Sequence, residues 1–157
     1  MVNFPIIIYS HSSYSDVWPL ILGQFKLYIP NSEIILFTDS DPLKGNYRPV
    51  FYDNKLNYNE RVIQCLQKIN DEVILFTHED MPLYSPPNFE ILGNYISHIH
   101  SGKADSIKLI FAGWHFKSKK LEFDETLSKN KLSRFSIQPT LIKPSTLVKI
   151  LKRYPSS

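Results

Sequence analysis

The amino-acid sequence predicts an α/β fold, a three-layer sandwich in which helices cover both faces of a mainly parallel sheet. Two observations support this fold class. Short apolar runs without polar alternation, at residues 4–9, 34–38 and 73–77, are typical of strands that are buried on both faces. Segments with helical spacing of apolar residues separate most of these runs, and such alternation favours parallel pairing.

The expected elements can be placed in order along the chain. The predicted strands cover residues 4–9, 34–38, 50–52, 73–77 and 106–111. The predicted helices cover residues 15–29, 57–69, 88–101 and 144–151. Pro19 lies early enough in the first helix to be tolerated, and Asn57 or Asn59 can cap the second. The 157 residues fit one domain, 1–157, with a single core.

Composition and charge narrow the functional classes. With 18 basic and 15 acidic residues, the net charge of +3 is too small to indicate nucleic-acid binding. The single cysteine, Cys65, excludes an internal disulfide and Cys-rich metal sites. No apolar stretch approaches the ~20 residues of a membrane span, and residues 1–10 do not read as a signal peptide. We therefore expect a cytoplasmic protein without a transmembrane segment.

Polar residues follow three of the predicted strands at their carboxyl ends. These clusters are Ser10-His11-Ser12-Ser13, Thr38-Asp39-Ser40-Asp41 and His78-Glu79-Asp80. Ligands of open parallel sheets bind beyond the carboxyl ends of the strands, so we expect the site at this edge.

The segment His78-Glu79-Asp80 follows the most apolar strand and has the chemistry of a metal site. Two carboxylates and an imidazole are suitable ligands for Mg²⁺ or Mn²⁺, and a divalent ion could stabilise a departing diphosphate. The simpler alternative is that Glu79 and Asp80 lie in solvent and cap a turn before Pro82. Residue spacing alone leaves both interpretations open.

Residues 58–69 and 72–81, with a helix followed by an apolar strand and an acidic end, resemble GT-A-type glycosyltransferases. Residues 106–110 and 136–143 are similar to segments of bacterial and viral glycosyltransferase-like proteins of surface-polysaccharide pathways. The resemblance implies a Rossmann-like nucleotide-sugar-binding architecture and transfer of a sugar from a UDP- or GDP-linked donor to a saccharide or other hydroxyl acceptor.

The resemblance also implies a role for each candidate residue. Asp80 and Glu79 would be catalytic, and Asp80, Glu79 and His78 would hold Mn²⁺ or Mg²⁺. The residues expected to bind the nucleotide sugar are Tyr9, Ser10, His11, Asp39 and Arg61. The residues expected on the acceptor side are Trp114, His115 and Gln138.

This sequence departs from the family pattern in two places. The acidic motif is His-Glu-Asp instead of Asp-x-Asp, and the chain ends soon after residue 139, where related enzymes continue with an acidic segment that can supply a base. Glu79 and Asp39 are the available candidates for that base. Two alternatives stay open: a non-catalytic nucleotide- or carbohydrate-binding relative, and a metal-dependent phosphoesterase using His11 with residues 78–80. Whether the domain is a fragment, truncated at its C-terminus, or a minimal enzyme is left open as well.

Overall fold

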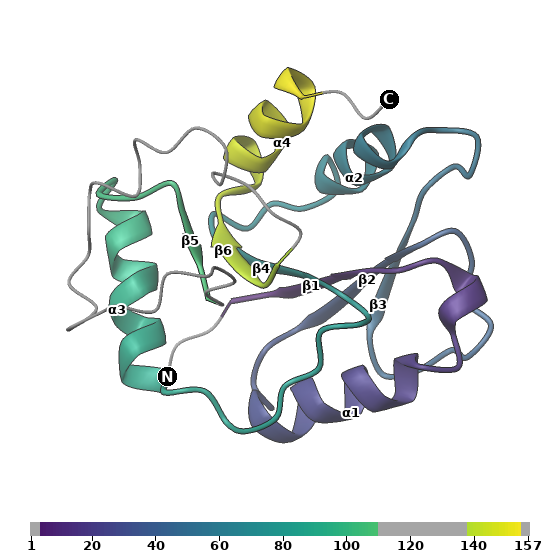
Figure 1. The fold of residues 1–157 in the computed structure, drawn as a ribbon, viewed down its shortest axis with the longest axis horizontal. Coiled ribbons are helices and arrows are strands. Elements are labelled where there is room, and N and C mark those ends of the chain that lie inside the picture. The colour runs from purple at the N-terminus through teal and green to yellow at the C-terminus, as the bar shows by residue number, and fades with distance from the viewer. Residues whose placement is uncertain (1–3, 110–137, 155–157) are drawn as a thin grey trace, which may run out of the picture.

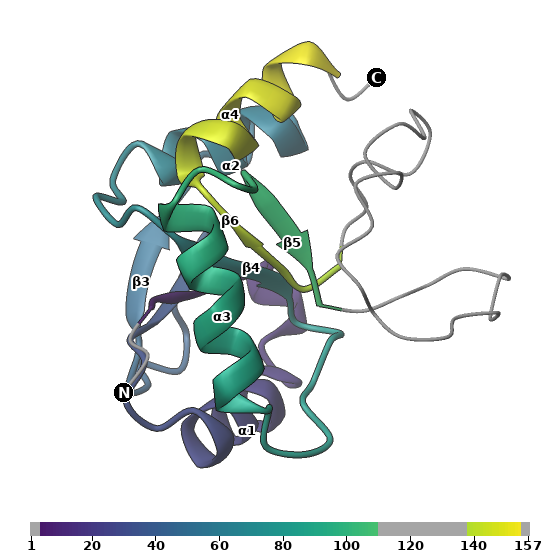
Figure 2. The same cartoon turned by 90° about the vertical axis from the view of Figure 1, so that its left-hand side faces the viewer.

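The computed structural model describes residues 4–109 and 138–154. Its strands are β1 (Ile6–Tyr9), β2 (Ile34–Thr38), β3 (Arg48–Phe51), β4 (Ile74–His78), β5 (Ser106–Lys108) and β6 (Thr140–Ile142). Its helices are the 3₁₀ helix η1 (Ser12–Tyr14), α1 (Trp18–Tyr28), α2 (Tyr58–Leu66), α3 (Phe89–His100) and α4 (Pro144–Arg153). Figures 1 and 2 show the arrangement in two orthogonal views.

The strands form one sheet in the order β3-β2-β1-β4-β6-β5. The pairs β2–β3, β1–β2 and β1–β4 are parallel, whereas β6 is antiparallel to both β4 and β5. Five strands therefore run in one direction and β6 runs against them. The predicted α/β fold with a mainly parallel sheet is confirmed.

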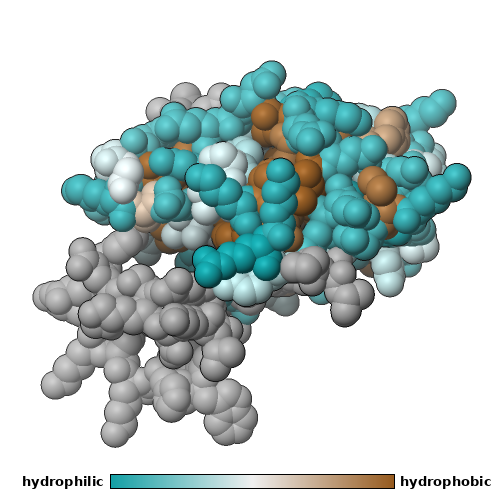
Figure 3. Space-filling view, turned by 90° about the horizontal axis from the view of Figure 1, so that it is seen from above, coloured by the Kyte–Doolittle hydropathy of each residue, from teal (hydrophilic) through white to brown (hydrophobic). Residues whose placement is uncertain are grey.

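Helices cover both faces of the sheet and make three layers. On one face α1 and α3 pack against Ile6 and Ile8, and on the other α2 and α4 pack against Ile7 and Tyr9. Successive side chains of β1 point to opposite faces, so both layers draw on the same strand. Figure 1 shows α1 below the sheet, α3 at its left beside β5, and α2 and α4 above it. The α2/α4 side is largely hydrophilic, with a hydrophobic strip near its middle (Figure 3).

The first helix differs from its prediction. We expected it to begin near Ser15, but residues 12–14 form η1, whose N-cap is His11, and α1 begins at Trp18 with Pro19 in its first turn. The imidazole of His11 accepts the Ser13 backbone N–H, which ends the strand region with a tight turn. Local side-chain to backbone bonding of this kind competes with helix formation and displaces the helix start.

The strand β6 was not predicted from the sequence. Its three residues are buried, and the run Leu141-Ile142 is too short to be assigned by periodicity so close to Pro144. The helix predictions at 57–69 and 88–101 are confirmed, with Asn57 and Asn88 as the capping residues. Within the described ranges, none of the helices combines the length and the hydropathy that crossing a membrane requires.

Candidate functional site

The strand register brings the three predicted polar clusters to one edge of the sheet. Tyr9 pairs with Phe37 of β2 and with His78 of β4, so β1 and β4 end at the same level and β2 ends one residue further on. The residues that follow, Ser10, Asp39 and Glu79, therefore leave the sheet side by side. We call this the carboxyl edge.

Asp39 organises the loops of the carboxyl edge. Its Oδ1 accepts the Ser12 backbone N–H at 2.7 Å, and its Oδ2 accepts the Ser12 hydroxyl at 2.9 Å and the Asn54 amide at 3.0 Å. Burial works against ionisation, but the hydrogen bonds from Ser12 and Asn54 outweigh it and lower the pKa of Asp39 to about 2. Both oxygens already serve the fold, and a carboxylate this acidic is a poor general base.

His11 lies beside Asp39, with 3.5 Å between its Nε2 and Asp39 Oδ2. Its Nδ1 accepts the Ser13 backbone N–H at 3.1 Å and lies 2.9 Å from the Ser13 hydroxyl. With Nδ1 accepting, the proton of the neutral ring lies on Nε2 and faces the Asp39 carboxylate. The side chain is 37% exposed, so this imidazole is accessible at the site.

Tyr9 and His78 belong to an aromatic cluster between the sheet and α2. Tyr9 stacks on Tyr52 at 5.4 Å between ring centroids and meets Tyr58 edge-on at 4.9 Å. His78 Nε2 lies 3.1 Å from the Tyr58 hydroxyl. Burial lowers the pKa of His78 to about 4, which the Asp80 carboxylate only partly opposes. His78 is therefore neutral at pH 7 and is held by the cluster.

Arg61 supports the same cluster from α2. Its Nε donates to the Leu56 carbonyl at 2.7 Å and its Nη2 to the Asn54 carbonyl at 2.6 Å. The guanidinium carbon lies 5.3 Å from the centroid of the Tyr52 ring, a cation–π distance. Arg61 thus ties the loop after β3 to α2 and leaves only part of its guanidinium for a ligand.

Ser10 and Glu79 lie on the side of the sheet that α1 covers. The Ser10 hydroxyl is buried and accepts the indole N–H of Trp18 at 2.8 Å. Burial raises the pKa of Glu79; hydrogen bonds from its own backbone and from Ser10 oppose this effect, and the Asp80 carboxylate adds to it. Within the described residues, Glu79 Oε2 is buried and has no hydrogen-bond partner.

An unpaired buried carboxylate oxygen carries a cost of about 1–3 kcal/mol, or more when it is charged. Glu79 is therefore stabilised by any ligand that supplies a proton donor or a cation. Asp80, which follows it, is exposed. These two carboxylates are the pair at the carboxyl edge that has ligand capacity left.

The three-residue metal set is not assembled in the part of the chain that the structure describes. No three His, Cys, Asp or Glu side chains gather there closely enough to hold an ion. His78 turns into the aromatic cluster, because side chains alternate along β4, and its Nε2 faces Tyr58. One carboxylate with solvent suits Mg²⁺ when a substrate supplies phosphate oxygens, so the exposed Asp80 fits such an ion.

The predicted acceptor residues are only partly described. Trp114 and His115 lie outside the described residues. Gln138 lies two residues before β6, is half-buried, and its backbone carbonyl accepts the Thr140 hydroxyl at 2.8 Å. Its acceptor role stays a prediction.

Four further residues at the carboxyl edge were not predicted as site residues: Ser12, Tyr52, Asn54 and Tyr58. Tyr52 donates its hydroxyl to the Ser10 carbonyl at 2.8 Å, across 42 residues of chain. Burial raises the pKa of both Tyr52 and Tyr58 above the usual value. The available signal was the place of Tyr52 at the end of the third predicted strand, since the ends of β1, β2 and β4 contribute to this edge.

Comparison with known proteins finds likeness in structure alone. No family model matches the sequence, and no curated protein matches it. The chain is similar to the solved structure of the bifunctional IspDF from Campylobacter jejuni, with a TM-score of 0.57 at 13% identity. The match covers 99% of this chain and 45% of that one, so this chain spans less than half of the IspDF length. At this identity the likeness shows the fold, an α/β sandwich.

Proposed function

We propose that the carboxyl edge binds a nucleotide sugar and that the protein transfers its sugar to a hydroxyl acceptor. The observation that carries the proposal is the pair Glu79 and Asp80, with one buried oxygen of Glu79 left unpartnered at the end of β4. The resemblance of residues 58–81 to GT-A-type glycosyltransferases supplies the substrate class. The position beyond the carboxyl ends of parallel strands is where such sheets bind ligands.

Asp80 would hold a divalent ion together with the oxygens of the donor diphosphate, and Glu79 beside it would stay unligated. When bound, the ion supplies neutralisation of the charge that develops on the leaving diphosphate. His11, exposed at the end of β1, lies within the same edge and offers the donor a hydrogen-bonding ring. Tyr9, Ser10, Asp39 and Arg61 keep the loops of this edge in place through the contacts described above.

In an inverting transfer, the bond between the sugar C1 and the diphosphate oxygen breaks, and the nucleoside diphosphate leaves with the bonding electrons. The acceptor oxygen forms the new bond to C1 and gives its proton to Glu79. Burial raises the pKa of Glu79, which favours proton uptake, whereas the lowered pKa of Asp39 disfavours it. Glu79 is thus the better base of the two candidates.

Calorimetric titration with UDP-glucose and GDP-mannose in the presence of Mn²⁺ tests the proposal. We expect wild-type protein to bind one donor class and Asp80→Ala to bind it about tenfold more weakly or not at all. Asp71→Ala is the matched control, because Asp71 is exposed at the opposite edge of the sheet, just before β4. If no donor binds, or if both variants bind alike, the proposal fails.

The second candidate is a nucleotide- or carbohydrate-binding protein without turnover. The observation that favours it is the engagement of Asp39, Arg61 and Ser10 in the fold, which leaves few side chains for chemistry. Release of nucleoside diphosphate from a bound donor separates the two functions. If the protein is a transferase, nucleoside diphosphate appears faster than it does from the donor in buffer without protein. Glu79→Gln then slows this release without loss of donor binding.

A further inference from the structure

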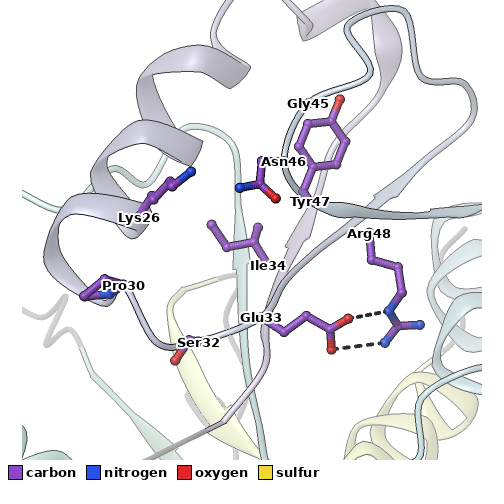
Figure 4. A pocket seen from close by; sticks show the side chains of 9 residues that line it. All are labelled: Lys26, Pro30, Ser32, Glu33, Ile34, Gly45, Asn46, Tyr47 and Arg48. Atoms are coloured by element: carbon purple, nitrogen blue, oxygen red, sulfur yellow. Dashed lines mark hydrogen bonds and ion pairs between the residues drawn. The ribbon is translucent and has the colours of Figure 1, made fainter.

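A cavity of about 420 Å³ lies at the other end of the sheet, where β2 and β3 begin. It is lined by the end of α1, the start of both strands and the turn before β3 (Figure 4). Its residues are Lys26, Pro30, Ser32, Glu33, Ile34, Gly45, Asn46, Tyr47 and Arg48. This amino edge lies at the other end of the strands from Glu79 and Asp80, so a ligand here goes beyond the proposed function.

Two nitrogen donors at the cavity are not used by the fold. Within the described residues, neither the Lys26 ammonium nor the Asn46 amide has a partner. In Figure 4 both side chains extend over Ile34 with their nitrogens toward each other. The Arg48 guanidinium is engaged by Glu33, through Nε at 2.7 Å and Nη2 at 3.5 Å, which cancels that pair of charges. The lining therefore keeps one uncompensated positive charge, that of Lys26.

The Tyr47 side chain forms one wall of the cavity, and contacts within the protein hold it in place. The Tyr47 hydroxyl donates to Asp41 Oδ1 at 2.5 Å, and the same oxygen accepts the Lys44 backbone N–H at 3.0 Å. The Tyr47 ring also meets the buried Trp18 edge-on, with 6.4 Å between centroids. The Tyr47 ring therefore loses little conformational freedom on binding, whereas the exposed side chains of Lys26 and Asn46 are ordered by the ligand.

The turn that carries this wall has an unusual backbone. Lys44 adopts a left-handed conformation, with φ of 49°, which costs a non-glycine residue about 1 kcal/mol or more. Gly45 follows, and a Cβ at that position would overlap the Tyr47 ring. Strain of this kind persists only where the surroundings hold it, as Asp41 does here.

Small oxyanions are the ligands that match an ammonium beside an amide donor. The lining is mostly polar, and Pro30, Ile34 and the ring of Tyr47 supply its apolar part. We propose that this cavity binds a small molecule that carries a phosphate or carboxylate group on an apolar or cyclic body. Lys26 and Asn46 hold the anionic group, and Tyr47 packs against the body of the ligand.

The test is a titration of ¹⁵N-labelled protein with phenyl phosphate, benzoate and inorganic phosphate, followed by amide NMR shifts. We expect saturable shifts at Lys26, Ile34, Asn46 and Tyr47. Tighter binding of phenyl phosphate than of benzoate identifies a phosphate ligand, and the reverse order identifies a carboxylate. Weaker binding of inorganic phosphate than of phenyl phosphate supports the role of the Tyr47 wall.

Two variants at the cavity and one control complete the test. Lys26→Ala and Asn46→Ala each weaken binding about fivefold or more, since each removes one donor to a charged group. Lys149→Ala, an exposed lysine of α4 on the other face of the sheet, leaves affinity unchanged. Absence of saturable shifts with all three probes overturns the proposal. So does equal affinity in the wild type and both cavity variants.

Discussion

The two edges of the sheet differ in how far their polar side chains are linked to one another by hydrogen bonds. At the carboxyl edge, Asp39, Ser10 and His78 have protein partners, and the loops there are linked across tens of residues. At the amino edge, Lys26 and Asn46 have no partner within the described chain. A polar cluster at a strand end is therefore not in itself a ligand site; what counts is the donor or acceptor capacity that the fold leaves unused.

By that measure, the carboxyl edge retains three groups: Glu79, Asp80 and His11. Glu79 has one oxygen unpartnered, Asp80 is exposed, and the His11 ring is accessible. The difference between the edges can be tested by changing residues at each. Residues of the linked network should affect stability strongly, and residues of the amino edge weakly.

The largest effect is expected for Trp18→Ala. Trp18 is fully buried, and its loss leaves a void in the core between α1 and the sheet and removes the donor to the Ser10 hydroxyl. We expect a loss of roughly 3–5 kcal/mol in the free energy of unfolding, measured by urea denaturation. Tyr84→Ala, at a position that is 91% exposed, should change it by about 0.5 kcal/mol or less. Equal effects of the two substitutions would refute the buried role of Trp18.

The next effect is expected for Asp39→Ala, which removes the acceptor for Ser12 and Asn54. At pH 7 we expect a loss of about 1–3 kcal/mol in unfolding free energy. The pKa of Asp39 is lowered from 3.8 to about 2, so its stabilisation is complete above pH 3.8 and is lost as pH falls toward 2. Wild type and variant should therefore converge at low pH, while Asp71→Ala, at the amino edge, should track the wild type throughout. Persistence of the full difference at pH 2 would contradict the network.

The third effect is a pH dependence that belongs to His78. Its pKa is lowered from 6.5 to about 4, so between these values the unfolded chain binds the proton and the folded protein does not. Stability is fully present above pH 6.5 and falls as pH drops toward 4, by at most about 1.4 kcal/mol per pH unit. His78→Phe should flatten this slope in metal-free buffer. An unchanged slope would assign the dependence to another group.

The smallest effect is expected for Glu33→Gln at the amino edge. The pair of Glu33 and Arg48 is solvent-exposed, with 51% and 42% of the side chains accessible. Exposed pairs contribute about 0–1 kcal/mol, so the unfolding free energy should stay within about 0.5 kcal/mol of wild type. If Glu33→Gln lowered the unfolding free energy as much as Asp39→Ala does, the two edges would not differ in their contribution to stability.

Much of the fold was predictable because its signals are local. The apolar runs of β1, β2 and β4 and the caps Asn57 and Asn88 need no knowledge of distant residues. The strand β6 was missed because it has three residues and is defined by pairing with β4 and β5. Three residues carry too little local pattern to predict a strand whose pairing depends on partners far away in the sequence.

The site was predictable in position but not in the state of its residues. Parallel strands guarantee that residues after Tyr9, Thr38 and His78 meet, whatever those residues are. Whether a carboxylate there is free depends on partners such as Asn54, which lies 15 residues beyond Asp39. For the same reason the sequence did not separate His78, held by Tyr58, from Glu79 and Asp80.

The most direct measurement is a map of backbone amide shifts during titration of the labelled protein with UDP-glucose and Mg²⁺. If the carboxyl edge is the donor site, saturable shifts appear at residues 10–13 and 78–80, and Asp80→Ala abolishes them. If the amide shifts of those two segments do not change at saturating ligand, the carboxyl edge is not the donor site, even if the shifts of residues 26–34 change.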